Sequence, residues 1–479
     1  MKGTTGRIIG NTFWLVLQRV GARILTFLLM IYLARGLGSL GFGKFTFATS
    51  FALLFLVLCD MGLTTLTIRE VARAKEKGPD YVGSTAVLKF FLSILAFLVI
   101  SVALAFMDMP QDTRIAAYFI SACIILENMG AFFGGIFNAY EDMKYVTIIE
   151  IVQKLFLVAA CLTALRQGSG LITVCFIYFL SGVLCLILNM WFVYRKFLRP
   201  RYHIDMGFWK ASLKESVPLA IVAVISMIYY HTDIVMLGKM KGEEVAGWYG
   251  VSYHIFFALA TIPGAFLTAA FPAMSRFFKE SQEKLKEAYR RSFKVMLGVG
   301  LPVSVGTFLL SDRIILSLFG AQYHHSARAL KIFSLIIIFS YMNSLAGYFL
   351  TSINKQRLTA KILVLTTGIN IALNFILIPR FSYMGAVYAT VFSEILFFTV
   401  FLMFLPGDFR SLPAAEFFGS LISSAIMAAS IYIMAKKDLA FSLIIIAAIA
   451  VYSVSIWVTG FLTKAEKDGI KNVFLKKMN

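Results

Sequence analysis

Long apolar stretches, separated by short polar segments, recur along the whole chain. About twenty consecutive apolar residues are enough for an α-helix to cross the hydrocarbon core of a bilayer. The stretches lack the alternation of a membrane β-barrel, and helices satisfy every backbone amide internally. The pattern therefore predicts an all-α polytopic membrane protein with fourteen spans, at residues 8–33, 45–68, 86–107, 115–137, 145–165, 171–193, 217–238, 248–271, 295–311, 330–351, 359–378, 384–405, 415–435 and 441–462.

The composition agrees with a membrane protein. Hydrophobic residues make up 59% of the 479 residues and charged residues only 15%, whereas soluble domains hold about 25% charged residues. The first apolar stretch is too long for a signal-peptide core. All five cysteines lie in apolar stretches without the paired spacing of a zinc or redox motif. We therefore expect one integral membrane unit with buried, unreactive cysteines.

The basic residues predict the orientation of the chain. Of the 45 Lys and Arg residues, 29 fall in segments on the side of the two termini, 12 fall on the other side and four lie within predicted spans. Cytoplasmic segments carry the excess of Lys and Arg, so both termini are expected in the cytoplasm. The net charge of +20 is concentrated in short loops beside the membrane, which favours contact with anionic inner-leaflet lipid over nucleic-acid binding.

The spans divide into two halves and a remainder. A long inner loop at 194–216 separates six spans from eight, and Gly41–Phe45 before span 2 is echoed by Ala246–Tyr249 before span 8. The two stretches precede spans of the same direction, as in parallel repeats. This predicts a six-helix lobe at 1–200, a second six-helix lobe at 201–408, and two extra helices with a basic cytoplasmic tail at 409–479.

Three groups of motifs resemble the oligosaccharide flippase family of the multidrug/oligosaccharidyl-lipid/polysaccharide (MOP) superfamily. They are Thr232–Gly238 with Ala246–Tyr249, Leu301–Gly306 leading to Leu318–Gly320 and Tyr323, and Asn374–Pro379 leading to Gly385, Ala386, Ala389, Thr390, Ser393 and Glu394. The resemblance implies two lobes around a central cavity that opens alternately to either side. It also implies that the two extra helices help to form a groove for a polyprenyl tail.

Two arginines in the first span are the leading candidates for substrate binding. Arg19 and Arg23 are four residues apart, hence on one helical face. A charge at that depth in a membrane costs free energy, so a charge that is present there suggests a function. Guanidinium groups match phosphate oxygens, so the pair could hold the pyrophosphate of a polyprenyl-linked glycan. The alternative is a structural ion pair, for which Asp60 in span 2 is the nearest candidate.

Other polar residues in the spans suggest further roles. Glu150 and Lys154 stand four apart, which favours a helical ion pair, although Lys154 could also contact phosphate. Glu127, Glu150 and Glu394 are candidates for ion coupling, because desolvation favours protonation of a carboxylate.

In span 7, Tyr230, His231 and Asp233 could bind sugar, although aromatic residues are common at membrane interfaces without any ligand. Lys89 lies close enough to a predicted span end to reach the interface, and no role is assigned to it.

The sequence predicts a flippase that moves a polyprenyl-pyrophosphate-linked oligosaccharide across the inner membrane. No G-x-x-x-x-G-K-[ST] motif is present, and no cofactor or metal is expected, since His324-His325 lacks a third ligand. Glycosyltransferases and a polymerase of the same pathway are possible partners. The residues leave open a lipid II flippase, a multidrug antiporter of the same superfamily, and a membrane glycan polymerase or ligase.

Overall fold

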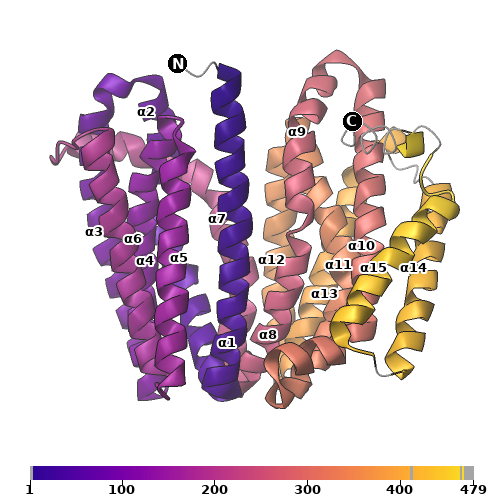
Figure 1. Cartoon of the computed structure of the whole chain (residues 1–479). Helices are drawn as coiled ribbons and strands as arrows, with labels where there is room; N and C mark the ends of the chain where they lie inside the picture. The colour runs from indigo at the N-terminus through magenta and orange to yellow at the C-terminus, as the bar shows by residue number, and fades with distance from the viewer. Residues whose placement is uncertain (1–3, 410–413, 438, 464–465, 469–479) are drawn as a thin grey trace. The chain divides into compact units, whose positions relative to one another are not determined.

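The structure is a computed structural model that describes residues 4–409, 414–437, 439–463 and 466–468 (Figure 1). This part of the chain consists of helices and short turns without a β-strand, which confirms the predicted all-α fold. Three short 3₁₀ helices lie at Lys75–Lys77, Gly407–Phe409 and Ala321–Tyr323. The α-helices are α1 (Thr4–Asp60), α2 (Leu63–Arg73), α3 (Gly78–Phe106), α4 (Gln111–Ala139), α5 (Met143–Arg166), α6 (Leu171–Lys196), α7 (Met206–Lys241), α8 (Glu243–Ala260), α9 (Pro263–Glu280), α10 (Gln282–Phe319), α11 (His324–Ser352), α12 (Gln356–Phe381), α13 (Tyr383–Phe404), α14 (Ala414–Lys436) and α15 (Phe441–Val458).

Helix α1 contains two spans, not one. A straight helix of its 57 residues would be about 86 Å long, almost three times the thickness of the hydrocarbon core. Gly38 inside it has a non-helical backbone with φ 73° and ψ 175°. Gln18 before this break and Thr64 after it line the same cavity, so the chain reverses at Gly38. The described residues hold 13 helical segments apolar enough to cross a membrane, with Gly21–Asp60 counted once, and the reversal accounts for the fourteenth.

The second span ends earlier than its apolar pattern predicts. Met61 and Gly62 both have positive φ, at 46° and 81°, and α2 starts as a separate short helix at Leu63. A Cβ atom on Gly62 would lie 2.6 Å from the carbonyl oxygen of Ser216 in α7. The close approach of α7 and the left-handed backbone therefore break a helix that was expected to continue to residue 68.

The first structural unit extends to Gly247 and includes α7. The segment before α7 is held on α3, where Arg201 donates from its backbone to the carbonyl of Pro79 at 2.9 Å. Trp209 in the first turn of α7 donates from Nε1 to the carbonyl of Ser84 at 3.1 Å. These contacts attach α7 to the preceding helices. The lobe boundary expected near residue 200 concerns the internal repeat and stays a prediction.

The second unit begins at Trp248. The span expected at 248–271 is interrupted, because α8 ends at Ala260 and α9 begins with Pro263 at its first position. Proline suits the first turn of a helix, where its missing N–H is not needed. Rings from α8 and α11 form an aromatic core, in which Phe333 packs at 5.6 Å from Tyr249 and 5.1 Å from Phe256 between ring centroids.

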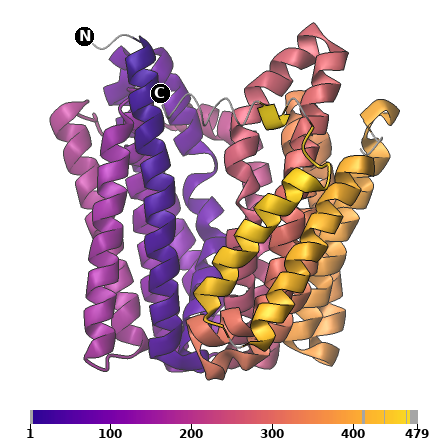
Figure 2. The same cartoon turned by 45° about the vertical axis from the view of Figure 1, so that its right-hand side comes forward.

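The last two helices, α14 and α15, lie side by side in both views (Figures 1 and 2). They are attached to α10 along its length. Tyr452 in α15 donates to the carbonyl of Gly298 at 2.7 Å, and Arg313 donates to the carbonyls of Ala435 and Leu439 at 2.8 and 3.1 Å. Arg313 thereby satisfies the carbonyl of Ala435 in the last turn of α14, which the helix itself leaves without a partner, and that of Leu439 in the segment after it.

Candidate functional site

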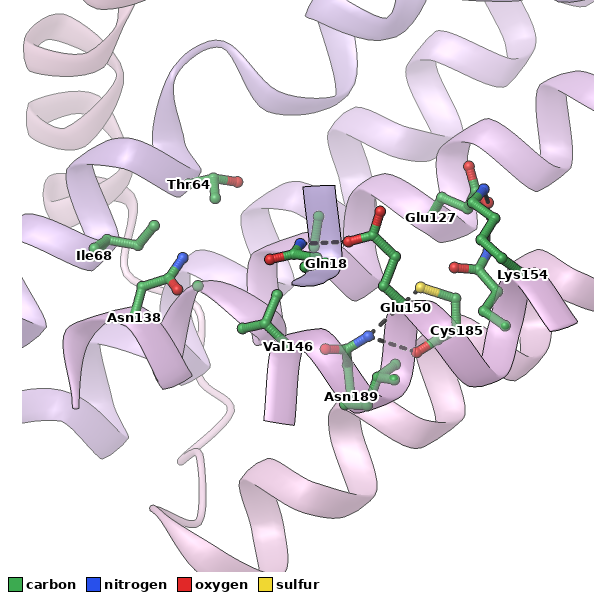
Figure 3. A pocket seen from close by; sticks show the side chains of 15 residues that line it. Gln18, Thr64, Ile68, Glu127, Asn138, Val146, Glu150, Lys154, Cys185 and Asn189 are labelled. Atoms are coloured by element: carbon green, nitrogen blue, oxygen red, sulfur yellow. Dashed lines mark hydrogen bonds and ion pairs between the residues drawn. The ribbon is translucent and has the colours of Figure 1, made fainter. Parts of the chain in front are cut away.

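A polar cavity of about 360 Å³ lies inside the first unit, among α1, α2, α4, α5 and α6 (Figure 3). Its charged residues are Glu127, Glu150 and Lys154, and its side-chain amides are Gln18, Asn138, Gln153 and Asn189. Burying polar groups of this kind in a membrane costs free energy, so they normally pair with one another or bind a ligand. The cavity brings together three of the residues that the sequence singles out.

Two glycines of α4 let the neighbouring helices pack closely around the cavity. A Cβ on Gly134 would lie 2.9 Å from Oδ1 of Asn189, and one on Gly135 would lie 2.9 Å from Cδ1 of Ile68. The absence of side chains at these positions lets α6 and α2 approach α4 closely. The polar groups of neighbouring helices can therefore face a common space.

The charges of the cavity are arranged across helices. Lys154 Nζ in α5 lies 3.9 Å from Glu127 Oε1 in α4, while Gln153 donates to the same oxygen. Glu150 accepts a hydrogen bond from Gln18 of α1. The helical Glu150–Lys154 ion pair that their spacing favours is thus replaced by a Glu127–Lys154 pair, because the packing of α4 against α5 brings Glu127 to the lysine. Side-chain exposures of 34% for Glu127 and 22% for Lys154 leave both open to the cavity.

A second ion pair lies behind the cavity and corrects the expectation for Lys89. Lys89 is fully buried and donates to Asp60, to Thr64 Oγ1 at 2.9 Å and to Asn128 Oδ1 at 2.9 Å. Lys89 therefore does not reach the interface, since α3 starts at Gly78 and the lysine lies about 16 Å along the helix. Among the described residues, the ion-pair partner of Asp60 is Lys89, and Arg23 forms no ion pair with it. Thr64 lines the cavity, so it links this pair to the cavity wall.

Arg23 is not among the described residues that line this cavity. The side chain of Arg19 lies outside the described residues. Arg23 is exposed on α1, and no ion pair joins it to another described residue. Their role in binding the substrate stays a prediction.

The candidates in α7 and α13 are not among the described residues that line the cavity. Asp233 is 3% exposed and Tyr230 37% exposed, and Tyr230 packs edge-on against the ring of Tyr229. In the second unit, Asn343 Nδ2 donates to Glu394 Oε2 at 2.8 Å. The sugar-binding and ion-coupling roles of these residues, His231 included, stay predictions.

Sequence reasoning missed the amides and Lys89. Gln18, Asn138, Gln153 and Asn189 stand within apolar helices, and isolated amides in such helices are a signal as informative as the charges. Within the described part of the chain no group of three His, Cys, Asp or Glu residues could hold a metal ion.

The family follows from a comparison with family models. The model described as "Polysaccharide biosynthesis protein" matches residues 8–278, which is more than half of the chain. This chain belongs to that family. A second model, described as MatE, matches residues 218–376, so both parts of the chain fall within the MOP superfamily of transporters. The protein is accordingly a multi-pass membrane transporter and not an enzyme.

Individual relatives agree with this assignment. A putative O-antigen transporter of Shigella flexneri is 22% identical over 395 residues, covering 79% of this chain and 93% of the relative. A probable low-salt glycan biosynthesis flippase of Haloferax volcanii is 22% identical and covers 77% of each chain. The fold resembles a solved lipid II flippase, MurJ, in an inward closed conformation, with a TM-score of 0.73, 15% identity, and coverage of 94% of this chain and 99% of that one. At such identity, the structural match establishes the fold alone.

Proposed function

We propose that this protein is a flippase that moves a polyprenyl-pyrophosphate-linked oligosaccharide from the inner to the outer leaflet by alternating access. The printed names of the relatives include an O-antigen transporter and a glycan biosynthesis flippase, which supports a lipid-linked glycan as cargo. The observation that carries the proposal is the ammonium group of Lys154 in a polar cavity inside a membrane protein. A cation there matches the negative charge of a pyrophosphate headgroup.

In the empty protein, Glu127 takes the place of the substrate's negative charge. Its carboxylate lies 3.9 Å from Lys154 Nζ, a distance longer than a charge-assisted hydrogen bond of about 2.8 Å. An incoming phosphate oxygen can make that shorter bond and displace Glu127. The lysine then keeps a counter-charge both with and without the substrate, which avoids an unpaired charge in the membrane interior.

The remaining candidates complete the proposal. Arg19 and Arg23 supply further cationic contacts for the pyrophosphate, and Tyr230, His231 and Asp233 contact sugar. Asp60 acts through Lys89 and Thr64 by fixing the wall of the cavity. Glu127, Glu150 and Glu394 are the candidates for coupling transport to an ion gradient. Such coupling is not required if the gradient of the lipid substrate drives transport.

The cellular setting follows from the same proposal. The protein lies in the inner membrane with both termini in the cytoplasm, as the distribution of Lys and Arg predicts. In this proposal, the lobes at 1–200 and 201–408 enclose the transport path. The helices after residue 409 form the groove for the polyprenyl tail. Glycosyltransferases and a polymerase of the same pathway supply and consume the cargo.

Replacing Glu127 by glutamine tests the role of the cavity. We expect Glu127→Gln to bind a polyprenyl-pyrophosphate glycan about fivefold more tightly, because the variant removes a competing, partly solvated ion pair of about 1 kcal/mol. Binding is measured by fluorescence with the purified protein, with inorganic pyrophosphate as competitor. Glu76→Gln, an exposed change in the same unit, should bind like the unmodified protein. Unchanged or weaker binding by Glu127→Gln would contradict the displacement model.

A multidrug antiporter is the second candidate, because two carboxylates and one ammonium of the described residues line the cavity and the MatE model matches residues 218–376. Carboxylates suit an organic cation. Binding of a fluorescent organic cation that Glu127→Gln abolishes, without any binding of the pyrophosphate lipid, would favour this second function over the first.

A further inference from the structure

A second cavity of about 360 Å³ lies in the second unit, where α10 and α14 begin and α15 has ended. Its lining is almost entirely charged and consists of Arg290, Arg291, Lys294, Glu287, Glu416 and Glu466 with Thr463. Three basic and three acidic side chains of the described residues surround one space, and their charges balance. A site of this kind suits a ligand that carries both charges.

Each basic residue is paired, but the arginines retain donors. Arg290 Nη2 lies 3.1 Å from Glu416 Oε1, and Arg291 Nε lies 2.6 Å from Glu287 Oε1. To the described residues, each guanidinium group donates this one hydrogen bond. Since a guanidinium carries five N–H groups, both arginines can bind phosphate oxygens without leaving their carboxylate partners.

Lys294 and Glu466 close the inner wall of the cavity. Lys294 Nζ lies 2.6 Å from Glu466 Oε2, and the lysine side chain is only 8% exposed. Burial alone would raise the pKa of Glu466, but the hydrogen bonds from Lys294 and Thr463 hold this pKa below its ordinary value. The wall is therefore an ionised pair that joins α10 to the segment after α15.

The cavity lies at the border between charged and apolar surface. Phe417 and Phe418, which directly follow Glu416, are 37% and 58% exposed, and the ring of Phe461 lies 5.2 Å below Lys294 Nζ. In a membrane protein, exposed aromatic residues beside a charged layer mark the level of the lipid headgroups. A ligand reaching the cavity from the bilayer arrives there with its headgroup.

We propose that this cavity binds the headgroup of an aminophospholipid, with its phosphate on Arg290 and Arg291 and its primary amine on Glu287 and Glu416. The excess charge of a headgroup with net negative charge would be repelled by the carboxylates of the cavity. A choline headgroup has no N–H to donate to them. The bound lipid bridges α10 to the start of α14, and this proposal does not depend on the identity of the transported cargo.

The test compares lipids on the purified full chain in detergent. Native mass spectrometry should show that the protein retains phosphatidylethanolamine at least fivefold more often than phosphatidylcholine or phosphatidylglycerol. Soluble phosphoethanolamine in excess should displace the retained lipid, because the headgroup alone carries the recognition. Equal retention of phosphatidylethanolamine and phosphatidylcholine, or failure of phosphoethanolamine to displace the lipid, would overturn the proposal.

Arg291→Gln is the variant to test. Arg291 is 73% exposed and, among the described residues, pairs only within its own helix, so the fold should tolerate the change. We expect this variant to lose the preference for phosphatidylethanolamine while its melting temperature in lipid-free detergent stays the same. The control Lys284→Gln removes an exposed charge from the same helix outside the cavity and should keep the preference. A preference that survives in Arg291→Gln would contradict the site.

Discussion

Replacing Lys89 by methionine should strongly reduce the amount of folded protein. Lys89 is fully buried, and its ammonium group is the ion-pair partner of Asp60. The variant leaves a carboxylate without its counter-charge in the membrane interior, and removing one partner of a buried pair costs about 3–5 kcal/mol. We expect a lower melting temperature in detergent and a lower abundance in membranes, both measured on the full chain by fluorescence of a C-terminal fusion.

The double variant Asp60→Asn/Lys89→Met separates the ion pair from general damage to packing. With both charges removed, no buried charge is left unpaired, so much of the lost stability should return. The control Lys210→Met changes an exposed lysine in α7 and should have no effect. A double variant as unstable as Lys89→Met alone would show that Lys89 does not stabilise the fold through its ion pair with Asp60.

Replacing Lys154 by glutamine should reduce transport by about ten- to a hundredfold at normal abundance. Among the described residues that line the cavity in the first unit, this lysine is the one cationic residue. A hydrogen bond to a charged group contributes about 1.5–3 kcal/mol. Its partner Glu127 keeps the hydrogen bond from Gln153, so the variant should fold. Export of the glycan in cells that lack the wild-type copy measures the effect.

Two further variants serve as controls for the effect of Lys154→Gln on transport. Lys154→Arg keeps the charge and should retain part of the transport, although a guanidinium differs in shape from an ammonium group. Lys144→Gln changes an exposed lysine on the same helix and should transport normally. Undiminished transport by Lys154→Gln at equal abundance would remove this residue from the binding site.

The sequence was sufficient for the class of fold because the apolar stretches are long and regular. It could not locate the ends of the helices where the backbone is dictated by tertiary contacts. The reversal at Gly38 and the break at Met61–Gly62 depend on left-handed backbone. At Gly62 the carbonyl of Ser216 from α7 adds a contact far away in sequence.

The site was predictable in part. The depth of a charge in a span indicated Glu127, Glu150 and Lys154, which the structure places around one cavity. Their partners were not predictable, because helical spacing describes neighbours within a helix and not the facing helix. The apolar pattern places Lys89 near the interface because the predicted span begins at residue 86, whereas the extension of α3 back to Gly78 places it in the interior.

Translocation in reconstituted vesicles tests the central claim most directly. A polyprenyl-pyrophosphate glycan with a fluorescent label is incorporated in both leaflets, and an impermeant reductant bleaches only the outer one. With the wild-type protein, the label of the inner leaflet should also become accessible, whereas vesicles with Lys154→Gln should resemble protein-free vesicles. Wild-type vesicles that keep their inner-leaflet label, or that move a glycan on a neutral polyprenol equally fast, would contradict a flippase that recognises the pyrophosphate.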